Sequence, residues 1–412
     1  MEFSQDIQEI LKTKFNNIDI YSLSKQELEL LKTQVEDLRH EYSLLELAQK
    51  TLGNAAYGAC ASPACYFFNV HLAEDITGEC RNLTKTMWRN LENWFHEGIW
   101  DRKDLWEKFD FELDENKHDW YREQPVSIYS DTDSVYISFG TFFKAMTAAS
   151  QSKYESDDAK LQWILKYNKE FQDKLNNKWC EDIYGPRFGH NIHEFELETV
   201  SKAGIYLAKK KYLKGLVFSK GNFYEKPKVS GTGIEIIKST TPALCRKILK
   251  ELMNDLMFNY KEDFKKEYIL EFQTKLSQYR KEFYAANIED ISQSVGVGNY
   301  KKYVKNDKDQ LVLEMRCPPG IQATARYNYL AHQNGEDNLY MVSGKIKYYN
   351  IRLGKNNNGF FGFPSGELPS WAPPMDKLTQ WQKTIIEPIN RFLETMNIPI
   401  VNAGDAQQLT LF

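Results

Sequence analysis

The sequence has no apolar run near the ~18 residues that a membrane-spanning helix needs, and no charged start followed by an apolar signal core. We therefore expect neither a membrane protein nor a secreted one. Its six cysteines form no C-x-x-C pair, which favours reduced thiols in a cytoplasm over a disulfide framework. The formal net charge is −4, so no global basic excess points to nucleic acid.

The overall composition is that of a folded protein. Hydrophobic residues make up 42% and charged residues 27% of 412 residues, which is enough chain for two or three domains. Two pairs could suggest zinc, His190 with His193 and Cys60 with Cys65. Neither pair has third and fourth ligands at zinc spacing, so we interpret all four as ordinary core or surface residues.

Basic side chains concentrate locally. Between Val200 and Ser230, eight lysines stand against one acid, a local charge of +7 in 31 residues that also contain several aromatics. A second stretch, Lys345 to Lys355, has four bases and no acid. One lysine run is equally consistent with a solvated face. Two runs, interleaved with aromatics and separated from the acids, favour a track for a polyanion.

Residues Ser24 to about Ala59 are predicted to form one long helix. Ser24 followed by Glu27 fits a capping box. Apolar residues then alternate steps of three and four, the spacing of a seam between paired helices. The seam residues are Leu28, Leu31, Val35, Leu38, Tyr42 and Leu45. We expect this seam to need a longer partner helix than these 412 residues supply.

Farther along, the apolar period changes to two between Val126 and Phe139, which predicts a hairpin that turns at 130–133. Helical patterns follow over 141–185, and strands over 200–228 with a turn at 219–222. From Pro242 helices dominate, and a final helix over 376–396 should kink at Pro388. This order of elements predicts an α+β fold.

A polar stripe occupies the C-terminal part of the long helix. Lys50, Asn54 and Tyr57, within K-T-L-G-N-A-A-Y-G, stand at positions i, i+4 and i+7 and share one face. A cation and a phenol on one face could take a triphosphate and a base. The alternative is a solvent-facing helix whose polar residues have no function.

Two aspartates lie at the predicted hairpin turn, Asp131 and Asp133 in Y-S-D-T-D-S. A D-x-D turn is often only a turn. Carboxylates at i and i+2 could equally hold Mg²⁺, which prefers oxygen ligands and substrate phosphates. Two such ions would activate an attacking hydroxyl and neutralise a leaving pyrophosphate.

The third constellation is Lys209, Lys210, Lys211 and Tyr212. Lysines here could hold phosphates or lie along a minor groove without reading base sequence.

These three motifs, in this order, resemble those of the family B DNA polymerases, whose motif B reads K-x-x-x-N-S-x-Y-G and motif C reads Y-G-D-T-D-S, followed by K-K-R-Y. Here Ala55, Ser130 and Lys211 replace the Ser, Gly and Arg. Within the family the chain is most similar to the T-even phage replicative polymerases. The run Gly233 to Pro242 resembles the palm-to-thumb transition of the family, and the runs Phe363 to Pro369 and Gln382 to Pro388 resemble the C-terminal region of that group.

The resemblance implies a partial right hand: one fingers helix in residues 1–60, an antiparallel-sheet palm in 61–233 with the motif C hairpin at 126–139, and a mainly helical thumb in 234–400. It also implies template-directed transfer of dNMP to a primer 3′-hydroxyl with two Mg²⁺ ions. Asp133 and Asp131 would be the catalytic and metal-binding carboxylates. Lys50, Asn54 and Tyr57 would bind the nucleotide, and the K-K-K-Y residues 209–212 the primer–template duplex.

The family's motif A, D-x-x-S-L-Y-P-S or close to it, has no counterpart here, and neither do the proofreading carboxylates or the first fingers helix. We therefore expect the C-terminal half of a split polymerase, active only with an N-terminal partner chain and located in the cytoplasm of a bacterial host if phage-encoded. One alternative is a non-catalytic DNA- and clamp-binding scaffold derived from a polymerase. Another is a protein-primed polymerase of the same family.

The last residues, 401–412, are predicted to be a flexible tether that ends in a short recognition peptide. Gln408, Leu409, Leu411 and Phe412 form Q-L-x-L-F, which resembles a sliding-clamp-binding motif. Such a peptide can place its apolar anchors in a pocket of a partner. The alternative is a frayed apolar terminus.

Overall fold

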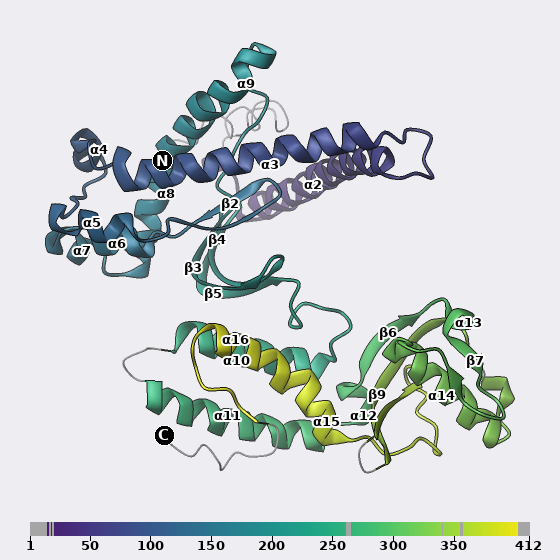
Figure 1. Ribbon diagram of the computed structural model, residues 1–412. Coiled ribbons are helices and arrows are strands. Elements are labelled where there is room, and N and C mark those ends of the chain that lie inside the picture. The colour runs from purple at the N-terminus through teal and green to yellow at the C-terminus, as the bar shows by residue number, and fades with distance from the viewer. Residues whose placement is uncertain are drawn as a thin grey trace. The chain divides into compact units, whose positions relative to one another are not determined.

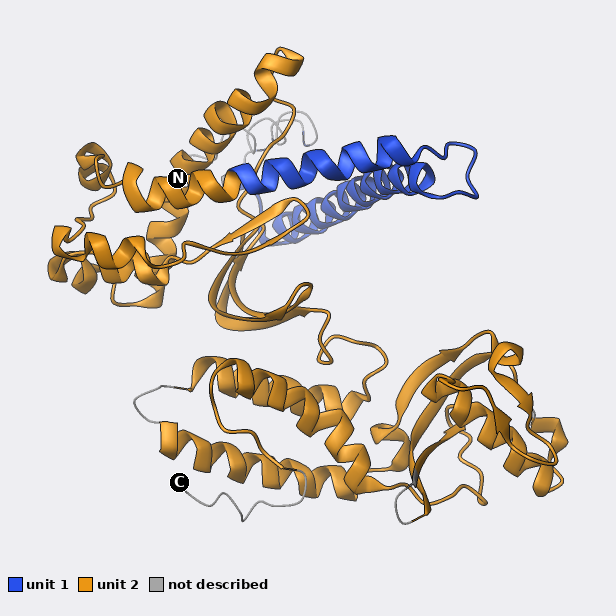
Figure 2. Ribbon diagram, in the orientation of Figure 1, with its two compact units in different colours: residues 1–86 blue, residues 87–412 orange. Residues whose placement is uncertain are grey.

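The computed structural model describes residues 15, 18, 20–260, 265–339, 341–354 and 357–402, and it divides into two compact units, 1–86 and 87–412 (Figure 2). Helices combine with small antiparallel sheets, so the predicted α+β class is confirmed. Among the described residues no helix is long and apolar enough to span a bilayer. The functional domain limits predicted from the sequence remain predictions.

The first unit is built on α2 (Lys25–Ala61), the predicted long helix. Its capping box is present: the Ser24 backbone N–H donates to Glu27 Oε2 at 2.8 Å, and Glu27 N–H donates to Ser24 Oγ at 3.4 Å. Of the predicted apolar seam only Leu31 is buried, whereas Leu45 is 51% exposed. The sequence therefore forms the helix, but its seam stays largely uncovered.

A second helix, α3 (Val70–Asn93), follows α2 and was not predicted (Figure 1). The chain reverses over 62–69, where Asn69 N–H donates to the Cys60 carbonyl at 2.9 Å. The Asn69 side chain accepts from Leu72 N–H at 3.1 Å and so caps the first turn of α3. Beyond residue 86, α3 continues into the second unit.

The first part of the second unit is helical and surrounds an aromatic core. Phe95, Phe142, Trp163, Tyr167 and Phe171 are all buried, and the Trp163 and Tyr167 rings stack with centroids 5.0 Å apart. The helical elements are the π-helical segment Trp94–Gly98, α4 (Lys103–Lys108), α5 (His118–Arg122), α6 (Gly140–Ala145), α7 (Ala148–Lys153), α8 (Asp157–Lys174), the π-helical segment Leu175–Cys180 and α9 (Glu181–Phe188). Helices over 141–185 were predicted.

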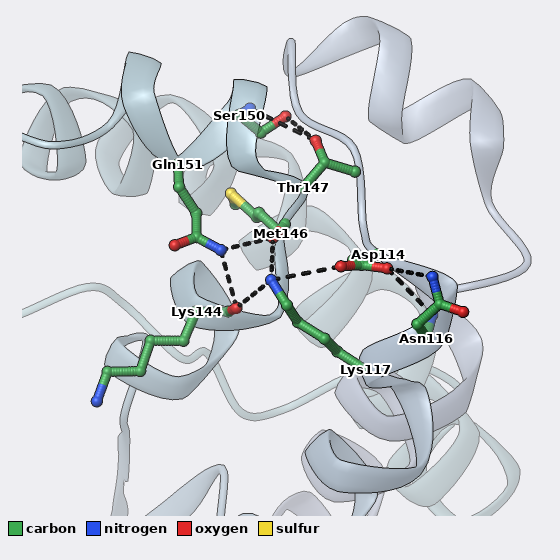
Figure 3. Close-up of polar contacts among 8 residues, drawn as sticks. All are labelled: Asp114, Asn116, Lys117, Lys144, Met146, Thr147, Ser150 and Gln151. Atoms are coloured by element: carbon green, nitrogen blue, oxygen red, sulfur yellow. Dashed lines mark hydrogen bonds and ion pairs between the residues drawn. The ribbon is translucent and has the colours of Figure 1, made fainter.

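Two side chains close the C-terminal end of α6 (Figure 3). Lys117 Nζ donates to the carbonyls of Lys144 and Met146 at 3.2 and 2.9 Å, and Gln151 Nε2 donates to the same two oxygens at 3.0 and 2.7 Å. The last carbonyls of a helix have no backbone partners, and the helix dipole also stabilises a cation at the C-terminal end. This contact fixes the segment that directly follows the β1–β2 hairpin.

Two sets of antiparallel strands lie in the middle of the chain. β1 (Ser127–Asp131) pairs with β2 (Ser134–Ile137), as predicted for the hairpin. The strands β3 (Thr199–Ala208), β4 (Lys211–Ser219) and β5 (Asn222–Thr232) form a meander. The predicted turn at 219–222 is present, but an additional reversal at Lys209 and Lys210 was not predicted.

The meander packs on helices that follow it. Ile205 of β3 and Leu213 of β4 share one core with α10 (Ala243–Phe258), α11 (Lys265–Ala285), α15 (Lys377–Trp381) and α16 (Glu387–Thr395). The predicted final helix is divided by a π-helical segment, Gln382–Ile386, which ends two residues before Pro388. Proline lacks a donor and clashes with the preceding turn, and the wider π turn accommodates it.

A three-stranded sheet lies between these helices in the sequence and was not predicted. Its order is β10 (Asn357–Phe363), β9 (Gly344–Gly354), β6 (Gln293–Val297), and α14 (Pro319–Gln333) packs on it. Short elements accompany it: α12 (Ile288–Ile291), α13 (Tyr300–Tyr303), β7 (Val304–Asn306) and β8 (Val312–Leu313).

The second basic stretch, Lys345 to Lys355, lies mainly on β9, and two of its cations have acidic partners. Lys347 pairs with Glu289 at 3.1 Å, and Arg352 pairs with Asp376 at 3.0 Å. The expected continuous track for a polyanion is therefore partly neutralised within the fold.

Candidate catalytic and DNA-binding site

The tip of the β1–β2 hairpin carries the two predicted carboxylates. Asp131 pairs with Ser134 in register, so Thr132 and Asp133 form the turn. Thr132 has a φ of 51°, a conformation that a β-branched residue adopts only with strain. The Asp133 side chain is exposed and Asp131 is half-buried. The turn thus presents two carboxylates two residues apart.

The tip of the β3–β4 hairpin carries the lysines. Lys209 and Lys210 form the turn between Ala208 and Lys211, and Lys210 has a φ of 59°. Gly233, with a φ of 64°, lies directly behind this turn. A Cβ on Gly233 would approach the Lys210 carbonyl to 2.1 Å. Only glycine allows both this close approach and this backbone conformation.

Four tyrosines join the two hairpins. Tyr129 and Tyr136 face each other across β1 and β2, and Tyr206 and Tyr212 face each other across β3 and β4. All six pairs of their ring centroids are 5.2 to 5.9 Å apart. We call these residues the tyrosine tetrad. Aromatic pairs at these distances are favourable beyond their burial.

Hydrogen bonds fix the tetrad. The Tyr136 and Tyr212 hydroxyls are 3.1 Å apart, and the Lys210 backbone N–H donates to the Tyr129 hydroxyl at 2.7 Å. Burial raises the pKa of Tyr206 to about 12. Burial and the bond to Tyr212 also raise the pKa of Tyr136. In both residues the neutral phenol, which can donate a hydrogen bond, is thus favoured still further over the phenolate.

The tetrad brings the lysines to the carboxylates. Lys210 Nζ lies 3.8 Å from Asp131 Oδ1, although the two residues are far apart in the sequence. The Asp131 side chain is 23% exposed and that of Lys210 61%. Carboxylate oxygens suit a hard cation such as Mg²⁺, so Asp131 and Asp133 fit one side of such a site. Within the described ranges, no three His, Cys, Asp or Glu side chains gather as metal ligands.

The four K-K-K-Y residues differ in what they can contact. Lys209, Lys210 and Lys211 are exposed. Tyr212 is only 8% exposed, and its hydroxyl is bonded to Tyr136. The lysines can therefore meet a ligand from solvent, whereas Tyr212 faces the motif C hairpin.

An extended segment passes close to the carboxylates. Asn176 holds it by two bonds to the Phe195 backbone, 2.9 and 2.8 Å long. Burial lowers the pKa of His193 in this segment, and the nearby Asp133 carboxylate opposes that shift. His190 is exposed. His193 was considered in the sequence only as a possible zinc ligand. The structure places it within electrostatic range of the Asp133 carboxylate, which the sequence did not indicate.

The remaining predicted site residues lie elsewhere in the chain. Lys50, Asn54 and Tyr57 are on α2 in the first unit, and all three side chains are exposed. Gln408, Leu409, Leu411 and Phe412 fall outside the described residues.

The tetrad itself was not predicted. Tyr206 was noted only as an aromatic among the lysines, Tyr212 as a duplex-binding residue of the K-K-K-Y element, and Tyr129 only as part of motif C. Alternation does place each pair on one face of its own hairpin. The pairing of one hairpin with the other leaves no local signal.

A double-mutant cycle tests the hydroxyl pair. Tyr136→Phe and Tyr212→Phe should each lower the free energy of unfolding by about 1 kcal/mol, since each leaves one half-buried hydroxyl without its partner. The double variant should cost little more than either single one. Denaturant unfolding of the four proteins measures this, and strictly additive losses would show that the two hydroxyls do not interact.

Comparison with known proteins identifies the family of the chain. The model of DNA polymerase family B matches residues 23–350. A DNA-directed DNA polymerase of Escherichia phage RB69 is 22% identical over 275 residues, which are 62% of this chain and 26% of the phage protein. The match spans about a quarter of that relative's length. Since the family model covers most of the sequence, the chain belongs to DNA polymerase family B.

Proposed function

We propose that this chain is the C-terminal part of a T-even-phage-like replicative DNA polymerase, which adds dNMP to a primer 3′-hydroxyl under the direction of a template. The observation that carries the proposal is the contact between the two hairpin tips, where Lys210 Nζ lies 3.8 Å from Asp131. Nucleotidyl transfer needs carboxylates for metal ions and cations for phosphates in the same place. The tetrad supplies that combination from two distant segments.

The two aspartates would hold the metal ions. Asp133, exposed at the turn, and Asp131 beside it offer oxygen ligands. When bound, Mg²⁺ neutralises charge on the reacting phosphates and lowers the pKa of the attacking hydroxyl. The protein's own contribution is to keep both carboxylates at a rigid turn whose flanking strands are pinned by Tyr129 and Tyr136.

The exposed lysines would hold the DNA. Lys209 and Lys211 flank the Lys210 turn and can contact backbone phosphates without reading bases. Tyr212, being buried, would act by positioning the carboxylate hairpin. On α2, Lys50 would meet the incoming triphosphate, and Asn54 and Tyr57 the nascent base pair, all three from one exposed stripe.

The reaction also requires polypeptide outside these 412 residues. Motif A would complete the metal site, and neither motif A nor the proofreading carboxylates of the family have a counterpart in this sequence. We assign both to an N-terminal partner chain. The exposed apolar seam of α2 supports this assignment, because Val35, Tyr42 and Leu45 are 45%, 53% and 51% exposed. A partner helix would cover them.

Primer extension tests the catalytic proposal. The chain with Mg²⁺, dNTPs and primed DNA should extend no primer by itself, because half of the metal site is absent. Adding a chain that carries motif A should restore extension, and Asp133→Ala should reduce the restored rate by about a thousandfold or more. Asp173→Ala, at an exposed carboxylate of α8, is the matched control and should have no effect.

Two outcomes would contradict this account. Extension by the chain alone would remove the need for a partner. Restored extension that survives Asp133→Ala would remove the motif C carboxylate from the chemistry.

Salt dependence tests the role of the lysines. Lys209→Ala combined with Lys211→Ala should weaken binding of a primer–template duplex. Each lost phosphate contact should reduce the slope of log K against log salt concentration by about one. Fluorescence anisotropy measures this, with Lys169→Ala, an exposed lysine of α8, as the control. An unchanged slope in the double variant would place the DNA elsewhere.

The C-terminal peptide would bind a sliding clamp. The proposal rests on the sequence of residues 408–412 alone. Deleting Gln407 to Phe412 should shorten products on long templates when a clamp is loaded, because its apolar anchors are lost. Single-nucleotide insertion should be unaffected. Equal product lengths with and without the peptide would refute the assignment.

A further inference from the structure

A small pocket opens on the helical part of the second unit. Its volume is about 240 Å³. Two tryptophans, two lysines, two asparagines and a glycine line it: Asn90, Asn93, Trp94, Gly98, Lys174, Lys178 and Trp179. This mixture combines cations, amides and flat aromatic surfaces.

Both walls of the pocket are π-helical. Trp94 and Gly98 belong to the segment Trp94–Gly98, and Lys178 and Trp179 to the segment Leu175–Cys180. Single π turns are rare within helices and occur frequently at functional sites. Two of them facing one pocket are therefore an unusual coincidence for a purely structural region.

Gly98 keeps one wall open. A Cβ on Gly98 would come within 2.6 Å of the Trp94 ring. The absence of a side chain thus lets the indole lie flat against the backbone. The Trp94 Nε1–H is already used, since it donates to the Tyr167 hydroxyl at 2.8 Å. The ring is consequently held in one orientation, with its face available to a cation.

Lys174 occupies that face. Its Nζ lies 3.1 Å from the centroid of the Trp94 ring and 5.8 Å from that of Trp179. Burial, together with the neighbouring charges of Arg102 and Lys178, lowers the pKa of Lys174 to about 8. Arg102 has Asp104 as a partner. Among the ion pairs of the described residues, none involves Lys174 or Lys178.

We propose that this pocket binds a nucleotide, with its phosphate at Lys174 and Lys178 and its base against the half-buried Trp179 ring. Neither ammonium group has a carboxylate partner among the described residues, so both can bind an anion. A phosphate would accept charge-assisted hydrogen bonds from both. An indole beside them offers the stacking surface that every base can use. The side-chain amides of Asn90 and Asn93 lie at the same opening for polar edges of the ligand. The inference does not depend on the proposed polymerase activity.

Competitive labelling of lysines tests the site on the intact chain. Acetic anhydride at pH 8 modifies neutral amines, and mass spectrometry reports each lysine separately. Bound dAMP should slow labelling of Lys174 by about tenfold at saturation, since a phosphate contact holds the amine in its charged form. Labelling of Lys169, exposed on the same helix, should be unchanged and is the internal control. Mass spectrometry also reports the labelling of lysines 209–211 separately from that of Lys174 and Lys169, so binding at the β3–β4 hairpin is not mistaken for binding at this pocket.

Three further arms define the ligand. Inorganic phosphate should protect Lys174 only at about tenfold higher concentration than dAMP, because it cannot stack. Trp179→Leu should abolish that difference while leaving protection by phosphate intact. Protection of Lys174 by oligo(dA) is then compared with protection by dAMP. Stronger protection by oligo(dA) identifies a DNA strand as the ligand, and stronger protection by dAMP identifies a free nucleotide; both results support the site.

Two results would overturn the proposal. If neither dAMP nor oligo(dA) protects Lys174 at millimolar concentration, the pocket takes no nucleotide. If phosphate and dAMP protect equally in the unmodified chain, the site is one for a simple anion and the indole has no part in it.

Discussion

The tyrosine tetrad is the contact on which the candidate site depends. Tyr129 and Tyr136 belong to the carboxylate hairpin, and Tyr206 and Tyr212 to the lysine hairpin. The carboxylate hairpin is a pair of short strands with a two-residue turn, an arrangement that is marginally stable by itself in water, whereas the lysine hairpin belongs to the β3–β4–β5 meander. Ring contacts within 6 Å and the Tyr136–Tyr212 bond join them. This contact brings Lys210 beside Asp131.

Strain at both tips fits this arrangement. Thr132 and Lys210 adopt positive φ, a conformation that costs a non-glycine residue about 1 kcal/mol or more. Such strain persists only where the surroundings over-determine the backbone. At the Lys210 turn, two neighbours constrain the backbone. The Tyr129 hydroxyl accepts a hydrogen bond from the Lys210 N–H, and Gly233 lies against the Lys210 carbonyl. The Lys210 turn is thus held from outside, which favours a fixed geometry for charged ligands.

The sequence predicted those elements whose signals are local. The Ser24–Glu27 capping box marks the start of α2, and alternation marks the motif C hairpin, because both depend on residues a few positions apart. The tetrad could not be predicted in this way, since Tyr129 meets Lys210 across 81 residues. In the sheet β6–β9–β10, the pairing of β6 with β9 is equally non-local, as α14 separates the two strands in the sequence. The β9–β10 hairpin is local and was missed all the same. The resemblance to a family indicated the chemistry, and the structure adds that Tyr212 faces inward.

The most direct test of the account is a photo-crosslink from the primer terminus. A primer that ends in 4-thiothymidine, annealed to template and irradiated with the chain, reports which peptides lie at its 3′ end. The account predicts adducts within residues 127–137 and 209–214, lost together when Tyr136 and Tyr212 are both replaced by alanine. Adducts confined to the sheet of β6, β9 and β10 would contradict it, because the primer terminus would then lie away from the joined hairpins.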